Sequence, residues 1–238
     1  MKILKWPILY IIIPYLIMFI WAIIYTMTGN SIETFNLFLE KYAIFLTISV
    51  ALIFIPLLKH NYKIKDNKIN KKDIIYSILL GLSLSIVYNT IIYYLNNSYH
   101  FTNIYEGNPN ILLAIISSGL VGPIIEEYIM RGIIYNELKK KYPIMKSIVL
   151  ATLIFALFHL NFIQMIYAFI LGFILIYVYE KSKNIKIPII LHITSNITTT
   201  LYVLLLNKGN LPIIIILYIL SLTILIFSKI KYINLKKQ

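Results

Sequence analysis

Cysteine is absent from this 238-residue chain. Its absence excludes disulfide bonds, thiolate metal ligands and a cysteine nucleophile. Two common hydrolase signatures are missing as well: the G-x-S-x-G nucleophile elbow and the H-E-x-x-H zinc helix. The familiar serine and zinc-protease patterns are therefore not available to this chain.

Charged residues are also scarce. They make up 13% of the chain, against about 25% in soluble domains, while 60% of the residues are hydrophobic and the mean hydropathy is +0.82. No soluble fold can hide that much apolar surface. An apolar stretch of about 18 or more residues is typical of a membrane-spanning helix. The composition therefore predicts an integral membrane protein.

Eight apolar stretches predict eight transmembrane helices. Lipid leaves the backbone of such segments no hydrogen-bonding partner but their own helix, so we expect an all-α, polytopic bundle. We expect a single domain, 1–238, because no polar loop is long enough for another. The expected spans are 8–27, 42–58, 74–95, 111–130, 148–162, 163–179, 187–206 and 211–227.

Acidic residues are few, and the net charge is +13. Membrane proteins concentrate Lys and Arg in cytoplasmic loops, so this charge does not require a nucleic acid, and we expect none as a partner. With eight spans, nineteen of the 22 basic residues fall on one side, and only Lys41, Lys208 and Arg131 do not. The alternation predicts a multi-pass protein of the cell membrane with both termini cytoplasmic.

Five ionisable residues interrupt the apolar spans: Glu126, Glu127, Arg131, His159 and His192. A charge at the centre of a bilayer costs roughly 2.5 to 3.5 kcal/mol on the lenient insertion scales, so such residues indicate function by default. Four of them lie in three spans, 111–130, 148–162 and 187–206, and Arg131 directly follows the first of these, so all five fall within a segment of about 111–206. We interpret this segment as the catalytic core.

The first of these spans carries adjacent acids. Glu127 and Arg131 are four residues apart, on one helix face, and can neutralise each other. Glu126 is rotated by about 100° and needs a partner on another helix. The spacing therefore predicts a structural ion pair beside an acid that is free to take a proton.

The other two spans carry one histidine each. Phe155 and His159 share a face, as do His192 and Asn196. Taken alone, His159 could be an ordinary packing residue, and His192 with Asn196 could hold helices together through hydrogen bonds. Both alternatives stay open at this point.

Together, the order Glu126-Glu127-x3-Arg131, Phe155-x3-His159 and His192-x3-Asn196 resembles the CPBP family of CAAX prenyl endopeptidase and bacteriocin-processing proteins, also called Abi. The resemblance implies an eight-helix intramembrane endopeptidase without a covalent intermediate. It assigns Glu126 and His159 to water activation and His192 and Asn196 to the oxyanion hole. Glu127, Arg131 and Phe155 become structural support.

A metal is the open question for such a site. Two histidines and a carboxylate are a legitimate zinc set, and Glu126, His159 and His192 would be the ligands. Relatives have been labelled metalloendopeptidases, yet the resemblance to the glutamate and histidine type favours a site without cofactor. We therefore expect no metal, with zinc as the alternative.

The expected helix edges place these residues at unequal depths. With edges at residues 130, 148 and 187, Glu126 lies about 6 Å deep, Asn196 about 14 Å and His159 about 17 Å, at about 1.5 Å per residue. Residues of one site should be level. We expect span 148–162 to begin several residues later than drawn, or the cavity to be deep.

Two other functions fit the same residues. One is a non-enzymatic bacteriocin self-immunity protein of the same family, and the other is an ion-coupled transporter that uses the buried acids as a relay. The peptidase predicts membrane lipid and a peptide or protein substrate near the cytoplasmic membrane face as its partners.

Overall fold

The structure is a computed structural model that describes residues 5–29, 52, 54, 56, 67–99, 111–159 and 161–234. Within these ranges the chain is all-helical apart from turns, as the sequence predicts. The elements are α1 (Lys5–Met27), α3 (Lys71–Tyr99), α4 (Ile111–Ala114), η2 (Ile115–Val121), α5 (Gly122–Glu127), η3 (Tyr128–Tyr135), α6 (Asn136–Lys141), α7 (Ile144–Leu157), α8 (Phe162–Ser182), α9 (Lys186–Asn207) and α10 (Leu211–Asn234).

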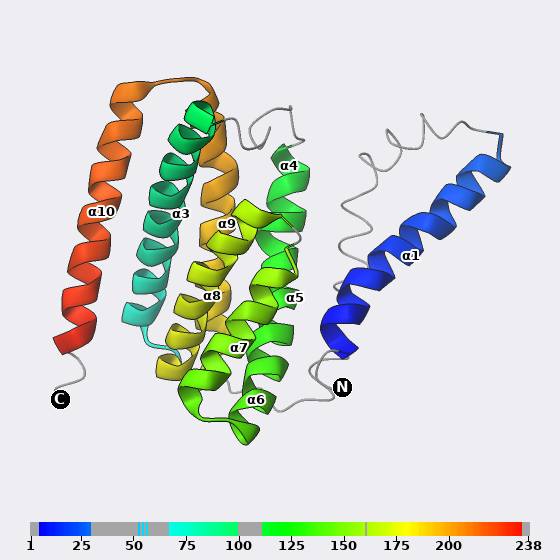
Figure 1. Cartoon of the computed structure of the whole chain (residues 1–238), viewed down its shortest axis with the longest axis horizontal. Coiled ribbons are helices and arrows are strands. Elements are labelled where there is room, and N and C mark those ends of the chain that lie inside the picture. Colours follow the sequence, from blue (N-terminus) through cyan, green and yellow to red (C-terminus); the bar gives the residue numbers. More distant parts are fainter. Residues whose placement is uncertain are drawn as a thin grey trace.

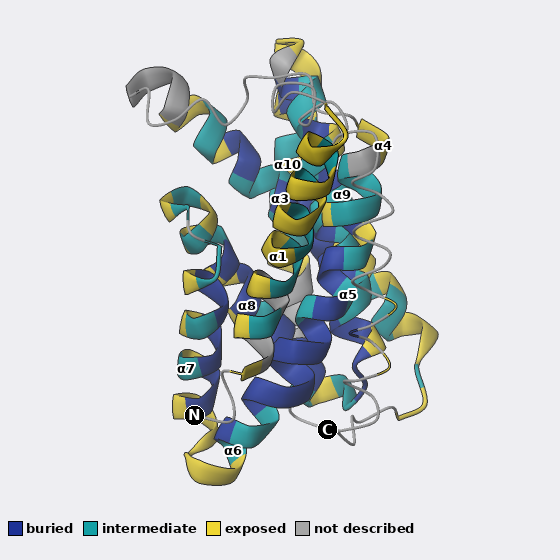
Figure 2. Cartoon of the chain, turned by 90° about the vertical axis from the view of Figure 1, so that its right-hand side faces the viewer, coloured by how far each residue is buried: buried dark blue, intermediate teal, exposed yellow. Residues whose placement is uncertain are grey.

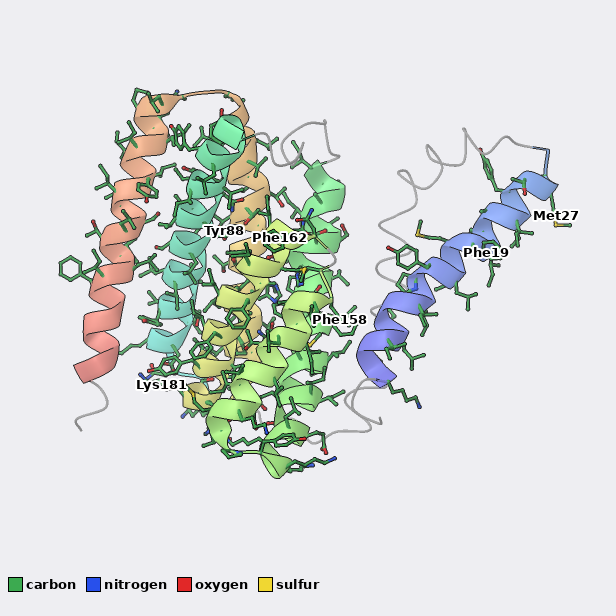
Figure 3. The ribbon with its side chains drawn as sticks, in the orientation of Figure 1. Phe19, Met27, Tyr88, Phe158, Phe162 and Lys181 are labelled. Carbon is green, nitrogen blue, oxygen red and sulfur yellow. The ribbon has the colours of Figure 1, made fainter. Side chains whose placement is uncertain are left out.

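Helix α9 lies at the centre of the bundle. It packs on α3, on α8 and on the run from η2 to α5, while α3 lies between α9 and α10 (Figure 1). Helix α1 lies to one side, and its Phe19 and Met27, labelled in Figure 3, are 63% and 82% exposed. A side chain on α9 can therefore meet partners from several helices.

Three helices are long and apolar enough to cross a membrane: Lys71–Leu95, Phe162–Ser182 and Lys186–Leu206. Three more are apolar but shorter: Ile12–Met27, Ile144–Leu157 and Leu211–Phe227. Large apolar side chains are exposed along most of these helices, as expected for surfaces that face lipid. The expected span 42–58 lies outside the described residues apart from Leu52, Phe54 and Pro56, so the count of eight stays a prediction.

The fourth expected span, 111–130, is too short. The helix continues without a break to Lys141, through η3 and α6. Arg131 suggests a membrane edge in the sequence, but it is only 1% exposed, and Ile133, Ile134 and Tyr135 after it are fully buried. Figure 2 shows the buried residues gathered between α5 and α6. Internal ion pairing, rather than water, accommodates the charge of Arg131.

Two π-helices flank the short helix α5, which carries both glutamates. The segment η2 precedes α5, and η3 follows it. π-helical turns are wider than α-helical ones and are frequent at functional sites. Hydropathy alone cannot reveal them.

The fifth expected span, 148–162, is displaced. Helix α7 runs from Ile144 to Leu157, so it starts earlier than predicted, not later, and His159 lies in the turn after it. The cause is Asn161, whose side chain accepts hydrogen bonds from the backbone N–H groups of Ile163 and Gln164 and caps α8. A capping residue takes an extended backbone, so α7 must end before it.

The other expected spans lie inside α1, α3, α8, α9 and α10. Their lysine-rich ends lie on one side of the bundle, toward the bottom of Figure 1. These ends are the starts of α1 and α3, the α6–α7 and α8–α9 turns and the end of α10. Figure 3 shows Lys181 near the lower end of α8 and Phe162 at the upper end. The turn with Lys208 lies at the opposite end of the bundle.

Candidate active site

The carboxylate of Glu127 stands at the centre of the candidate site. Its Oε1 atom accepts hydrogen bonds from Arg131 Nη1 at 2.6 Å and from His192 Nδ1 at 2.8 Å. The three side chains are 0%, 1% and 2% exposed, respectively. The ion pair expected from the i, i+4 spacing therefore forms, and it extends across the bundle to α9.

His192 lies between the two glutamates. A carboxylate paired with an arginine can only accept, so His192 Nδ1 carries the hydrogen of its bond to Glu127. The opposite ring nitrogen, Nε2, lies 3.8 Å from Glu126 Oε2. The partner that Glu126 needs on another helix is thus His192.

The two acids occupy different environments. Glu127 is fully buried and engaged twice, whereas the Glu126 side chain is 23% exposed. A water molecule or a substrate can therefore reach Glu126 more easily than Glu127. This asymmetry agrees with a structural acid beside a reactive one.

Phe155 connects the cationic and imidazole groups. The Arg131 guanidinium carbon lies 4.6 Å from the centre of the Phe155 ring. The rings of His159 and His192 meet the same ring edge to face, with centroids 4.9 and 5.7 Å away. One buried phenyl ring therefore packs against both histidines.

His159 has a defined ring orientation. Its Nδ1 atom lies 2.9 Å from the carbonyl oxygen of Phe155, and a carbonyl can only accept, so Nδ1 donates. The neutral ring then has its lone pair at Nε2. An imidazole held in this way can accept a hydrogen bond from a water molecule.

The expected difference in depth between Glu126 and His159 disappears when residues are counted from the α6–α7 turn. As many residues separate Glu126 from Lys141 as separate Ile144 from His159, and the α6–α7 turn joins the two arms. Each arm is about 20 Å long at about 1.5 Å per residue. The unequal depths came from ending the fourth span at residue 130, and neither a later start of α7 nor an unusually deep cavity is needed.

Asn196 lies one turn after His192 on α9. Its Nδ2 atom donates to the carbonyl oxygen of Ser118 in η2, at 2.8 Å. An amide nitrogen carries two hydrogens, so one remains for another acceptor. The bond to η2 fixes the direction in which that second hydrogen points.

Gly172 of α8 completes the surroundings of Arg131, and the sequence interpretation missed it. Its carbonyl oxygen accepts from Arg131 Nη2 at 3.2 Å. A Cβ atom at this position would lie 3.0 Å from Phe155 Cδ1 and 3.2 Å from Thr152 Cγ2. The signal available was a single glycine in an otherwise bulky apolar helix.

The alternative zinc set of Glu126, His159 and His192 does not form a ligand group. Among the residues that the structure describes, no three His, Asp or Glu side chains converge as a metal would require. The Nδ1 atom is the engaged nitrogen of each histidine, with Phe155 and with Glu127, and such a bond on the far nitrogen is also common in metal-ligating histidines. The expectation of no metal, with zinc as the alternative, therefore stays a prediction.

Comparison with known proteins places the chain among membrane proteases. Residues 108–198 match the family described as type II CAAX prenyl endopeptidase Rce1-like. The chain is 33% identical over 174 residues to the "Membrane-embedded CAAX protease MroQ" of Staphylococcus aureus (strain USA300), covering 64% of this chain and 68% of that protein.

A second relative matches over a shorter stretch. It is the "Putative membrane peptidase YdiL" of Bacillus subtilis (strain 168), 33% identical over 84 residues, which are 35% of this chain and 34% of that protein. The matched part thus spans about a third of one relative and about two thirds of the other. No solved structure matches the chain.

Proposed function

Because the chain belongs to the type II CAAX prenyl endopeptidase Rce1-like family, we propose that it is a membrane endopeptidase in which Glu126 and His159 activate a water molecule. The observation that carries the proposal is the asymmetry of the acids. Glu127 is buried and bonded to Arg131 and His192, whereas Glu126 is partly exposed and faces His192 Nε2. Such a division of roles between neighbouring carboxylates is typical of acid–base sites.

The reaction begins with a water molecule held between Glu126 and His159 Nε2. Glu126 takes one proton from the water while the oxygen attacks the carbonyl carbon of the scissile peptide bond. The carbonyl π electrons move to its oxygen, which becomes an oxyanion. Protonated Glu126 then gives its proton to the leaving nitrogen as the C–N bond breaks. The products are a carboxylic acid and an amine, and the enzyme returns to its starting state.

His192 and Asn196 donate hydrogen bonds to the oxyanion in this mechanism. Asn196 uses the Nδ2 hydrogen that Ser118 does not occupy, and His192 uses Nε2–H when its ring is doubly protonated. The Glu127 carboxylate then faces the cationic ring at Nδ1, while Glu126, which has taken the proton of the water, lies on the Nε2 side. A donor aimed at an oxyanion contributes about 10²- to 10³-fold in rate.

Glu127, Arg131 and Phe155 hold these groups in place. Glu127 orients the His192 ring through Nδ1, and Phe155 packs against both imidazoles. Hydrogen bonds to the far nitrogen of a histidine fix its tautomer and its direction. None of these three side chains needs to touch the reacting atoms.

The environment of the reaction forms part of the proposal. The protein crosses the cell membrane several times, and the lysine-rich end of its bundle faces the cytoplasm. The substrate is a membrane-associated peptide or protein that reaches the site from that face. The reaction needs no metal. Purified protein treated with a chelator should contain no stoichiometric zinc and keep its activity; loss of activity that zinc restores would overturn this part.

The test compares membrane peptides from cells that express the wild type or the Glu126→Gln variant. We expect cleavage products with the wild type that disappear in the variant, although the variant inserts at a normal level. Glu137→Gln is the matched control, because Glu137 lies on the same helical run and, among the residues that the structure describes, pairs only with Lys140 at the surface. Unchanged products in the Glu126 variant would refute the proposal and favour a protein that acts by binding.

A further inference from the structure

Helix α3 lies outside residues 108–198, which match the family, yet its backbone comes close to that of α9 at Gly81. A Cβ atom on Gly81 would lie 2.6 Å from the carbonyl oxygen of Leu191 and 3.2 Å from the backbone nitrogen of Ser195. Any larger residue would push the two helices apart. Small residues at such crossings are the usual means by which membrane helices pack closely.

One turn further along α3, Ser85 makes hydrogen bonds to α9. Its hydroxyl donates to the carbonyl oxygen of Ser195 at 2.7 Å and lies 2.8 Å from the Ser195 hydroxyl. Tyr167 of α8 joins the same cluster, with its hydroxyl 3.0 Å from Ser85 Oγ and also bonded to Ser195 Oγ. Ser85 and Ser195 are fully buried.

The two residues of α9 that α3 approaches are sequence neighbours of the site residues. Leu191 directly precedes His192, and Ser195 directly precedes Asn196. In a helix, consecutive residues are rotated by about 100°. Contacts that fix the direction of Leu191 and Ser195 therefore also fix the direction of His192 and Asn196.

We propose that Ser85 is a positioning residue that locks the rotation of α9, and that Gly81 allows the close approach this lock requires. The lock holds His192 against Glu126 and Glu127 and holds Asn196 against Ser118. Its effect on cleavage rests on the function proposed above, whereas its effect on the His192 ring does not.

The chain offers a matched control for this proposal. Ser83 lies on the same helix and is as fully buried as Ser85, but within the described part of the chain its hydroxyl has no hydrogen-bond partner. Ser85→Ala and Ser83→Ala therefore remove the same atom from the same helix and create no clash. Only the first removes a bond to α9.

The first measurement needs no substrate. The chain has four histidines, so full-length protein labelled with ¹⁵N-histidine in detergent gives few ring signals, and a His192→Asn variant assigns those of His192. We expect Ser85→Ala to shift or broaden the ring nitrogen signals of His192 and Ser83→Ala to leave them in place. Equal His192 signals in the two variants would overturn the proposal.

The second measurement uses a synthetic peptide that spans a junction cut by the wild type but not by Glu126→Gln. We expect Ser85→Ala to lower kcat at least tenfold with little change in KM, because misplacing a catalytic group by about 1 Å can cost about 10²-fold. Equal kcat in the two serine variants would refute the lock, even if Glu126→Gln is inactive. If Glu126→Gln cleaves normally, the function fails and the histidine signals decide the lock alone.

Discussion

The Glu127→Gln variant should have a lower thermal stability than the wild type. The Glu126→Gln variant should be about as stable as the wild type. Glu127 Oε1 accepts two hydrogen bonds from charged or chargeable partners, and the side chain is fully buried. Gln keeps the shape but removes the negative charge. Arg131, which is 1% exposed, would then stand in the core without its directly bonded counter-charge.

Removing one partner of a buried ion pair costs about 3 to 5 kcal/mol. For a domain of this size, 1 kcal/mol corresponds to roughly 2 to 4 °C in Tm, so we expect the Tm of Glu127→Gln to fall by roughly 6 to 20 °C. Glu126 is partly exposed and lies 3.8 Å from His192. Its replacement should change the stability by less than about 1 kcal/mol.

A double variant tests the cause. Glu127→Gln with Arg131→Met removes both charges, so it should recover part of the lost stability. Recovery stays incomplete, because Arg131 also donates to Gly172 and stacks on Phe155, and a desolvated cation–π contact contributes about 2 kcal/mol.

Thermal denaturation in detergent, followed by the fraction that stays monodisperse, provides the measurement. The expected order of Tm is wild type, double variant, then Glu127→Gln. A Glu127→Gln protein as stable as the wild type, or a double variant no better than the single one, would show that the ion pair does not stabilise the core.

Three further predictions concern other parts of the molecule. Gly172→Ala should lower the free energy of unfolding by about 1 to 3 kcal/mol through overpacking, because its Cβ would lie 3.0 Å from Phe155. It should also reduce cleavage. Unchanged Tm and kcat would contradict the tight contact. Asn196→Ala should reduce kcat by about 10²-fold while the Tm moves little; a full-rate variant would remove Asn196 from the oxyanion hole. An impermeant maleimide should label Lys208→Cys in intact cells and Lys141→Cys only after permeabilisation, since the chain has no other cysteine; the reverse pattern would invert the orientation.

Much of the fold and the pairing of site residues follows from the sequence. Long apolar stretches predict helices wherever the bilayer is the only environment for the backbone, and five of the expected spans lie inside α1, α3, α8, α9 and α10. Four-residue spacing likewise predicts that Glu127 meets Arg131 and that Phe155 meets His159, as observed. Both inferences need only helical periodicity.

The remaining features depend on tertiary contacts. Hydropathy treats Arg131 as an edge, because it cannot know that Glu127, Gly172 and Phe155 surround the charge. The position of His159 outside α7 depends on the cap made by Asn161. The bond from His192 to Glu127 likewise arises only when the helices are packed together, and the π-helical turns around α5 leave no mark in the hydropathy pattern.

The hairpin of α6 and α7 sets the distance between the candidate site and one end of the bundle. Glu126 and His159 lie the same number of residues from its lysine-rich turn. Lengthening one arm alone should separate them, whereas equal insertions in both arms should move the pair together. If that turn rests in the headgroup layer, the arm length of about 20 Å selects which bond of a membrane-embedded peptide is cut by its distance from the surface. Selectivity would then depend on depth as much as on the residues beside the bond.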